Sequence, residues 1–215
     1  RLQPASLEAG VKYLVQSATG SVMVILGIAL VLGRTGTLEL AEIHAAAQSG
    51  DVWLLAAGAL FLVGFGVKVA LVPLHTWLPD AHSQAPSGIS AMLSGIVIEA
   101  GLVAMLRALG ALTEVSQVWG GLLMGAGALN MLVGNLMALR QQQIKRLLAY
   151  SSLSHVGYML VGLGLAVTYG VQSGANGAFF HLFNHAMMKG LAFFAVGALM
   201  YGMLISRGVH KALEV

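Results

Sequence analysis

A lysine and a proline interrupt a long apolar run, and this combination limits what the chain can fold into more than any other feature. The run extends from Val52 to Val72, with Lys68 well inside it and Pro73 directly after it. A lysine at bilayer depth costs ~3 kcal/mol or more unless it pairs, reaches water or loses its proton. Proline removes a backbone donor and blocks the helical bond one turn back. We therefore expect a helix broken near Pro73, which membranes tolerate where the backbone is buried in protein or lines a wet cavity.

Several titratable residues directly follow this apolar run, in the stretch PLHTWLPDAHSQAP. His75, Asp80 and His82 follow Pro73 and form an interfacial cluster with Trp77. The simpler alternative is a kinked anchor whose lysine reaches the membrane surface. More than three turns of apolar residues precede the lysine, which is too deep for that alternative. We favour a functional break.

The composition defines a membrane protein. Hydrophobic residues make up 58% of the 215 and charged residues 9%, whereas soluble domains carry roughly 25% charged residues. The net charge of +3 comes from scattered basic residues, so no nucleic-acid partner is expected. There is no cysteine, phosphate loop or haem motif, and we expect no cofactor and no metal. The chain begins with Arg1 and without a signal-peptide pattern, so we expect a piece of a longer polypeptide.

Apolar runs of ~20 residues predict the spans of an all-α, polytopic transmembrane bundle with about six helices, one of them broken. The predicted helices are Leu7–Gly33, Val52–Leu78, Ser87–Leu109, Val118–Leu139, Ile144–Val167 and Ala175–Leu204. A short amphipathic segment is expected between Arg34 and Asp51.

The basic residues fall mainly on one side of these alternating spans, which predicts that this side is cytoplasmic. On it lie Arg1, Arg140, Lys145, Arg146, Arg207 and Lys211, against Arg34 and Arg107 on the other side. We interpret Lys145 and Arg146 as cytoplasmic anchors of the fifth span. Near the start of the first span, Glu8 and Lys12 have the i,i+4 spacing of a salt bridge, with a role for Lys12 in the polar interior as the alternative.

One acidic residue, Glu99, lies in the middle of a predicted span. A buried carboxylate needs a cation or a proton, and Lys68 on a neighbouring helix is the partner we expect. Our hypothesis is that both belong to one chain of protonatable groups. A purely structural salt bridge is the alternative.

The last two spans carry histidines and a lysine. FFHLFNHAMMKGLAFF places His181, His185 and Lys189 at i, i+4 and i+8, a slanting stripe ~12 Å long on one helix face. His155 lies inside the preceding span, where either a proton relay or a structural role is open. The stripe lacks the glutamate of a metalloprotease motif, so we expect a hydrated proton path and not a metal site.

Three motifs in order, KVALVPLHTWLPDAHSQAP, KRLLAYSSLSHVGYM and FHLFNHAMMKGLAFF, resemble the antiporter-like membrane subunits of respiratory complex I. The same family includes subunits of membrane-bound hydrogenases and multisubunit sodium/proton antiporters. The resemblance covers nearly the whole chain and implies about the sixth to eleventh helices of a fold built from two inverted repeats. Residues 1–139 would hold most of the first repeat plus a connecting helix, and residues 140–215 would start the second.

The resemblance also implies roles. Lys68 matches the family's central lysine, His155 a polar position of the tenth helix, and His181, His185 and Lys189 the polar residues of the eleventh. Lys145 falls on the family's basic residue at the start of the tenth helix. Glu99 departs from the family, which usually has a lysine or histidine there.

The function that the resemblance implies is proton translocation by a subunit of an NADH:quinone oxidoreductase-type complex. The chain would hold no redox or catalytic centre, and its partners would be other membrane subunits, lipid and protons, with sodium as an option. It would be a multi-pass protein of an energy-converting membrane, of the bacterial plasma type or an equivalent. The alternatives are a sodium/proton antiporter or membrane-bound hydrogenase subunit, and a scaffold whose buried charges are relics.

Overall fold

The computed structural model describes residues 4–116 and 118–213, and every regular element in these ranges is helical. Arg1 lies outside these ranges, and the side chains of Arg207 and Lys211 are not among those described. The elements are α1 (Pro4–Thr35), α2 (Leu40–Ala46), α3 (Val52–Lys68), α4 (Trp77–Gln84), α5 (Ser87–Met92), a π-helical turn (Leu93–Val97), α6 (Ile98–Gly110), a 3-10 turn (Thr113–Val115), α7 (Val118–Leu139), α8 (Ile144–Tyr169) and α9 (Gln172–Leu213).

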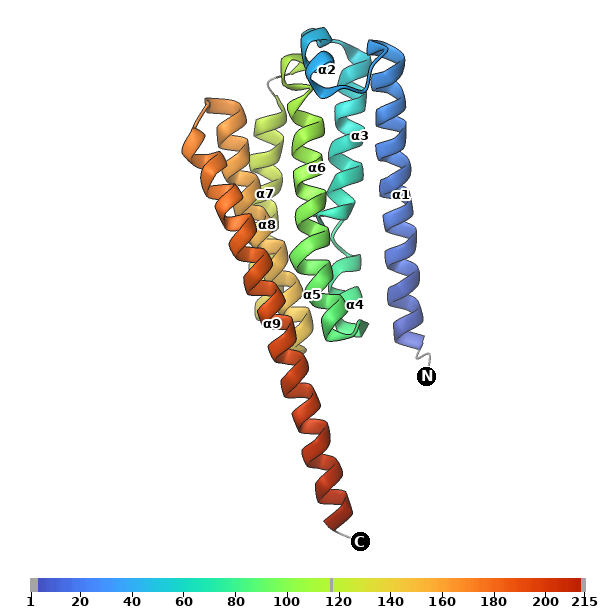
Figure 1. The fold of residues 1–215 in the computed structure, drawn as a ribbon, viewed down its shortest axis with the longest axis vertical. Helices are drawn as coiled ribbons and strands as arrows, with labels where there is room; N and C mark the ends of the chain where they lie inside the picture. The colour runs from blue at the N-terminus through green and yellow to red at the C-terminus, as the bar shows by residue number, and fades with distance from the viewer. Residues whose placement is uncertain (1–3, 117, 214–215) are drawn as a thin grey trace.

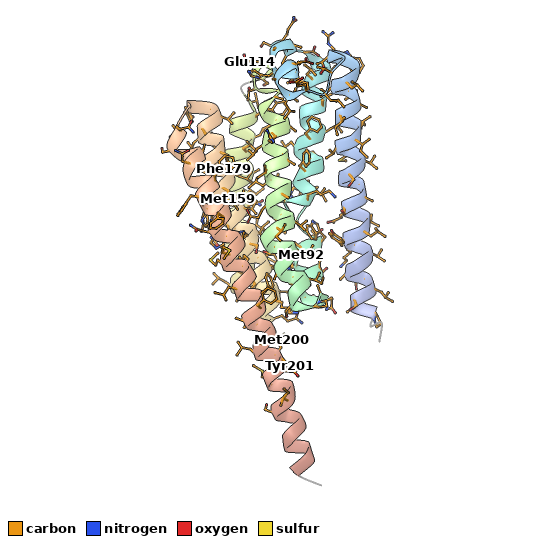
Figure 2. All side chains as sticks on the ribbon, in the orientation of Figure 1. Met92, Glu114, Met159, Phe179, Met200 and Tyr201 are labelled. Atoms are coloured by element: carbon orange, nitrogen blue, oxygen red, sulfur yellow. The ribbon has the colours of Figure 1, made fainter. Side chains whose placement is uncertain are left out.

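The long helices run side by side, and the short ones lie at the two ends of the bundle (Figure 1). α1 forms one edge beside α3, while α9 leans along the opposite side against α8. α2 crosses one end of the bundle, which we call the α2 end, and α4 lies near the other, the α4 end. Beyond the α4 end α9 projects alone, and Met200 and Tyr201 lie on this projecting part (Figure 2).

The predicted all-α bundle is confirmed. Among the described residues, five helices are long and apolar enough to cross a membrane, counting α5 to α6 as one from Ser87 to Gly110, and the shorter α3 is a further apolar helix. The predicted span Val118–Leu139 coincides with α7. α9 begins three residues before the predicted Ala175 and continues nine residues past Leu204.

The break expected near Pro73 is present, and it is wider than a kink. α3 ends at Lys68 and α4 begins at Trp77. Pro73 has no N–H to donate to the carbonyl of Val69, and it disfavours helical geometry at Val72, so the helix stops a turn earlier. Ala70 between them has a left-handed φ of 58°.

Side chains satisfy the backbone groups that this break exposes. The indole of Trp77 donates to the carbonyl of Val67 at 2.8 Å. The Asn130 side chain on α7 accepts from the N–H of Val72 at 2.8 Å and donates to the carbonyl of Ala70 at 3.5 Å. Because unpaired backbone groups are costly away from water, these bonds allow a non-helical segment inside an apolar bundle.

α7 and α8 pack closely through glycines. A Cβ at Gly127 would lie 2.7 Å from the carbonyl oxygen of Gly157, and one at Gly157 would lie 2.5 Å from the carbonyl oxygen of Gly127. Small residues of this kind let two membrane helices approach at backbone distance. This packing crosses the predicted repeat boundary at residues 139 and 140, which stays a prediction.

The segment between α1 and α3 contains the short helix α2, where an amphipathic surface segment was predicted. Ile43 is buried on its inner face, while Leu38 and Leu40 remain exposed. The side chain of Asp51 caps the start of α3 by accepting from the N–H groups of Trp53 and Leu54.

Candidate functional site

Side chains from three helices form a connected group inside the bundle. Nδ1 of His155 on α8 lies 3.0 Å from Nε2 of His181 on α9. The ring of His155 also lies 5.3 Å, centroid to centroid, from that of His185. Nδ1 of His185 in turn lies 2.5 Å from Oε1 of Glu99 on α6. We call these four residues the histidine cluster.

The cluster forms because α9 passes very close to the helix that carries Glu99. A Cβ at Gly95, in the π-helical turn, would lie 3.0 Å from the carbonyl oxygen of Ala186. Glycine at this point lets the backbone of α9 approach, and the neighbouring His185 thereby reaches Glu99. The π-helical turn directly precedes this segment, and such turns are frequent at functional sites.

The inner part of the cluster is shielded from solvent. The exposed fraction is 0% for His185 and 5% for Glu99. Oε2 of Glu99 and Nε2 of His185 have no hydrogen-bond partner among the residues that the structure describes. Ionisable groups at such positions in membrane helices are costly and are usually functional.

Lys189 lies two turns along α9 from His181 and is only 2% exposed. Its Nζ donates to the carbonyl oxygen of Leu148 at 3.1 Å. The hydroxyl of Ser152 donates to the same carbonyl at 3.1 Å and lies 2.7 Å from the hydroxyl of Ser94. A second polar chain therefore joins α9, α8 and the π-helical turn.

Lys68 does not pair with Glu99, contrary to the partnership expected from the sequence. Its Nζ donates to the hydroxyl of Ser17 on α1 at 3.1 Å, and no ion pair between Lys68 and Glu99 occurs within the described chain. The base of the lysine side chain faces Gly101 of α6, where a Cβ would lie 3.3 Å from Cβ of Lys68. Residues 99 and 101 differ by about 200° around a helix, so Glu99 faces away from α3 and toward α9.

The side chain of Lys68 belongs to the C-terminal turn of α3. This lysine is the last residue of α3, where unpaired carbonyls concentrate the negative end of the helix dipole.

Pro73 is exposed in the break that follows, and the ring of His75 lies edge-on to that of Tyr150, 6.4 Å between centroids. Pro73 and His75 both belong to the non-helical segment between Lys68, where α3 ends, and Trp77, where α4 begins.

At the α4 end, Asp80 joins three elements by ion pairs. It accepts from Lys12 of α1 at 2.9 Å and from Arg146 of α8. Burial acts to raise the pKa of the Asp80 carboxyl, but hydrogen bonds from Lys12 and Arg146 outweigh it and hold the pKa below its usual value of 3.8. Lys12 also bonds Glu8 at 2.7 Å, so the predicted i,i+4 pair is present. Together with Gln143, these residues line a polar cavity of about 270 Å³.

The two residues predicted as anchors hold α4 against α8. Nζ of Lys145 donates to the carbonyl oxygen of Ala85 at 2.8 Å, just after α4, while Arg146 binds Asp80. His82 of α4 faces the other way, is completely buried and stacks on Phe193 of α9.

Sequence reasoning missed three polar residues. Asn130 bonds the broken segment, and Ser94 and Ser152 extend the polar chain of Lys189. A polar side chain in an apolar helix is the only sequence signal for any of them. In the described residues no group of three His, Cys, Asp or Glu side chains is placed to hold a metal ion.

The fold and the site together define a class of protein. It is a polytopic membrane protein with a broken helix that ends in a lysine, beside a buried chain of histidine, glutamate and lysine side chains. Imidazole can donate at one nitrogen and accept at the other, so such a chain can carry protons.

The chain belongs to the NADH:quinone oxidoreductase/Mrp antiporter transmembrane family, whose family model matches residues 1–212. Hydrogenase-4 component B of Escherichia coli (strain K12) is 38% identical over 213 residues, covering 93% of this chain and 31% of the relative. NADH-quinone oxidoreductase subunit N of Chromohalobacter salexigens is 42% identical over 161 residues, covering 74% of this chain and 34% of the relative. The chain thus spans about a third of the length of these curated relatives.

Two solved structures share the fold. The archaeal membrane-bound sulfane sulfur reductase matches with a TM-score of 0.82 at 36% identity, covering 91% of this chain and 40% of that one. The Mrp complex from Dietzia sp. DQ12-45-1b matches with a TM-score of 0.83 at 27% identity, covering 93% and 36%. The resemblance inferred from the three motifs is confirmed, and this chain is an integral membrane component of the antiporter-like kind.

Proposed function

We propose that the whole protein translocates protons across a membrane as the antiporter-like subunit of an NADH:quinone oxidoreductase-type complex. The observation that carries this proposal is the unbroken contact chain from His181 through His155 and His185 to Glu99 inside an apolar bundle. Electron transfer in other subunits would drive transport.

Each group has a role in the proposed path. Protons enter from the expected cytoplasmic side and reach Lys68, whose charge changes with each cycle. They then pass to Glu99 and along the α9 stripe to Lys189. Lys68 on α3 lies against one side of α6, and Glu99 projects from the other side toward α9. The proton therefore crosses between them through hydration water and not by direct contact.

We place this chain within a larger two-repeat architecture. Residues 1–139 would form most of the first repeat together with the connecting helix, and residues 140–215 would begin the second. The relatives are subunits of multi-subunit membrane complexes, which supports other membrane subunits as partners. Lipid surrounds the exposed apolar faces, and protons, with sodium as the alternative ion, are the species carried.

A second candidate is a subunit of a multisubunit sodium/proton antiporter, which the structural similarity to the Mrp complex favours. A membrane-bound hydrogenase subunit is supported in the same way by the hydrogenase-4 relative. Both would use the same buried groups, and they differ in what drives the transport.

The deciding experiment measures proton uptake by vesicles that contain the full parent complex. Wild type is compared with Lys68→Ala and with a control, His44→Ala, which changes an exposed histidine of α2. The electron donor is supplied first, and a sodium gradient is imposed in a separate run.

We expect electron flow to drive uptake in wild type and in His44→Ala, and Lys68→Ala to abolish it while the complex still assembles. Wild-type pumping by Lys68→Ala would overturn the proposed path. Uptake driven by sodium alone would assign the chain to the antiporters.

A further inference from the structure

The ring of His82 is buried and has no hydrogen-bond partner among the described residues. It lies on α4, its exposed fraction is 0%, and neither Nδ1 nor Nε2 has a partner in the described part of the chain. A neutral imidazole always carries one N–H donor and one acceptor nitrogen. Buried polar groups are nearly always paired, so this ring calls for an explanation.

Packing alone does not account for a histidine here. The ring of His82 stacks on Phe193 of α9, with 4.7 Å between centroids and 13° between planes. A phenylalanine would make the same stack without burying unpaired nitrogens. The choice of imidazole therefore adds a cost that a purely structural role would not need.

Cations flank this ring on two elements. Lys189 lies one helical turn before Phe193 on α9, and Lys145 of α8 bonds the carbonyl of Ala85 just after α4. Both lysines act electrostatically on His82. α5 contributes the uncharged Ser90, whose hydroxyl donates to the carbonyl of His82 at 3.4 Å, and the charged Asp80 faces the other side of α4.

We propose that His82 is the residue that reloads Lys189 with a proton from the α4 end. This inference rests on the proposed proton path and adds a second entry to it, which each transport cycle needs in addition to the entry through Lys68. While Lys189 keeps its proton, a positive charge on His82 is repelled by two ammonium groups. Once Lys189 has given up its proton, that repulsion falls and His82 can accept one.

The step balances without any other reactant. A proton from water at the α4 end binds the free ring nitrogen of His82, and the N–H proton of the other nitrogen passes to the neutral amine of Lys189. The imidazole is left neutral in its other tautomer and reverts by ring or proton exchange. No redox change occurs in this chain.

The test uses vesicles of the full parent complex and measures protons taken up per electron transferred. His82→Phe keeps the aromatic stack on Phe193 and removes both nitrogens, so a packing role predicts unchanged stoichiometry. His44→Phe is the matched control at an exposed histidine. We expect His82→Phe to assemble and to lower proton uptake about tenfold or more, with His44→Phe at the wild-type level.

Chemical rescue separates proton transfer from a structural defect. In His82→Gly, added imidazole should restore uptake with a dependence on pH that follows the titration of free imidazole. Uptake by His82→Phe within twofold of wild type, or a loss in His82→Gly that imidazole does not relieve, would overturn the inference. Lys189→Ala is measured alongside: if it also pumps normally, the proposed path itself fails, whereas normal pumping by His82→Phe alone removes only the second entry.

Discussion

His185 of α9 is bonded directly to Glu99 of α6, with 2.5 Å between Nδ1 and Oε1. This contact connects two helices that are 86 residues apart in sequence at these positions. It also changes the expected role of the acid, because Glu99 is the partner of the α9 stripe and not of Lys68. A carboxylate in this place can stabilise a positive charge on the histidine cluster as a proton passes.

Removing either side chain of the Glu99–His185 pair should strongly destabilise the protein. Glu99→Ala leaves His185 buried without its partner, and removal of one member of a buried pair costs about 3–5 kcal/mol. We expect Glu99→Ala and His185→Leu each to lower the free energy of unfolding, and the double variant to lose less than the sum of the two. Denaturant unfolding of the purified full-length protein in detergent measures all three.

Additive losses would show that the two side chains do not interact. Glu99→Gln provides a further comparison, because it keeps the size and hydrogen-bonding capacity of the side chain while removing its charge. We expect it to be milder in stability than Glu99→Ala and still to impair proton uptake.

Asn130 should be essential to the broken segment although it bears no charge. Asn130→Ala leaves the N–H of Val72 and the carbonyl of Ala70 without that partner, at a cost of about 1–3 kcal/mol for an unsatisfied buried group. Asn135→Ala on the same helix changes an exposed side chain and should stay within about 0.5 kcal/mol. Equal stability of both variants in thermal unfolding would contradict the role of Asn130.

The ion pairs of Asp80 predict how stability depends on pH. Burial acts to raise the pKa of Asp80, but the bonds from Lys12 and Arg146 hold it below 3.8 in the folded protein. The unfolded chain therefore binds a proton first, so these pairs stabilise the fold above pH 3.8 and the gain is lost as pH falls through the lower folded value. Water reaches this site, so each pair contributes at most about 1 kcal/mol.

Asp80→Asn should therefore be less stable than wild type at pH 7, and the difference should shrink below pH 4. Unfolding curves of the two proteins between pH 7 and pH 3 provide the measurement. A difference that does not change with pH would mean that the charge of Asp80 contributes nothing.

The glycine contact between α7 and α8 should not tolerate a methyl group. A Cβ on Gly157 would lie 2.5 Å from the carbonyl oxygen of Gly127 and 2.9 Å from the backbone nitrogen of Met131, so the helices must move apart. We expect Gly157→Ala to cost about 1–3 kcal/mol, the usual range for overpacking. Gly125→Ala, where nothing lies within 4 Å of the added carbon, should leave the melting temperature unchanged or raise it.

Much of the fold was predictable because it depends on local hydrophobicity and on proline. Apolar runs defined the spans, and Pro73 marked the break in the helix that carries Lys68. The stripe of His181, His185 and Lys189 followed from spacing on one helix, since four residues turn a helix by about 40°. The π-helical turn before Glu99 and the full length of α9 were not predicted, because neither has a local composition that distinguishes it.

The sequence by itself determined on which helices the ionisable groups lie, since composition and periodicity are properties of the chain alone. Only the tertiary structure decided their partners. Glu99 and Gly101 are two residues apart and therefore face different neighbours, which directs Glu99 to His185 and leaves Lys68 to Ser17. That choice depends on how the helices are rotated and how closely glycines let them approach, and no single helix contains this information.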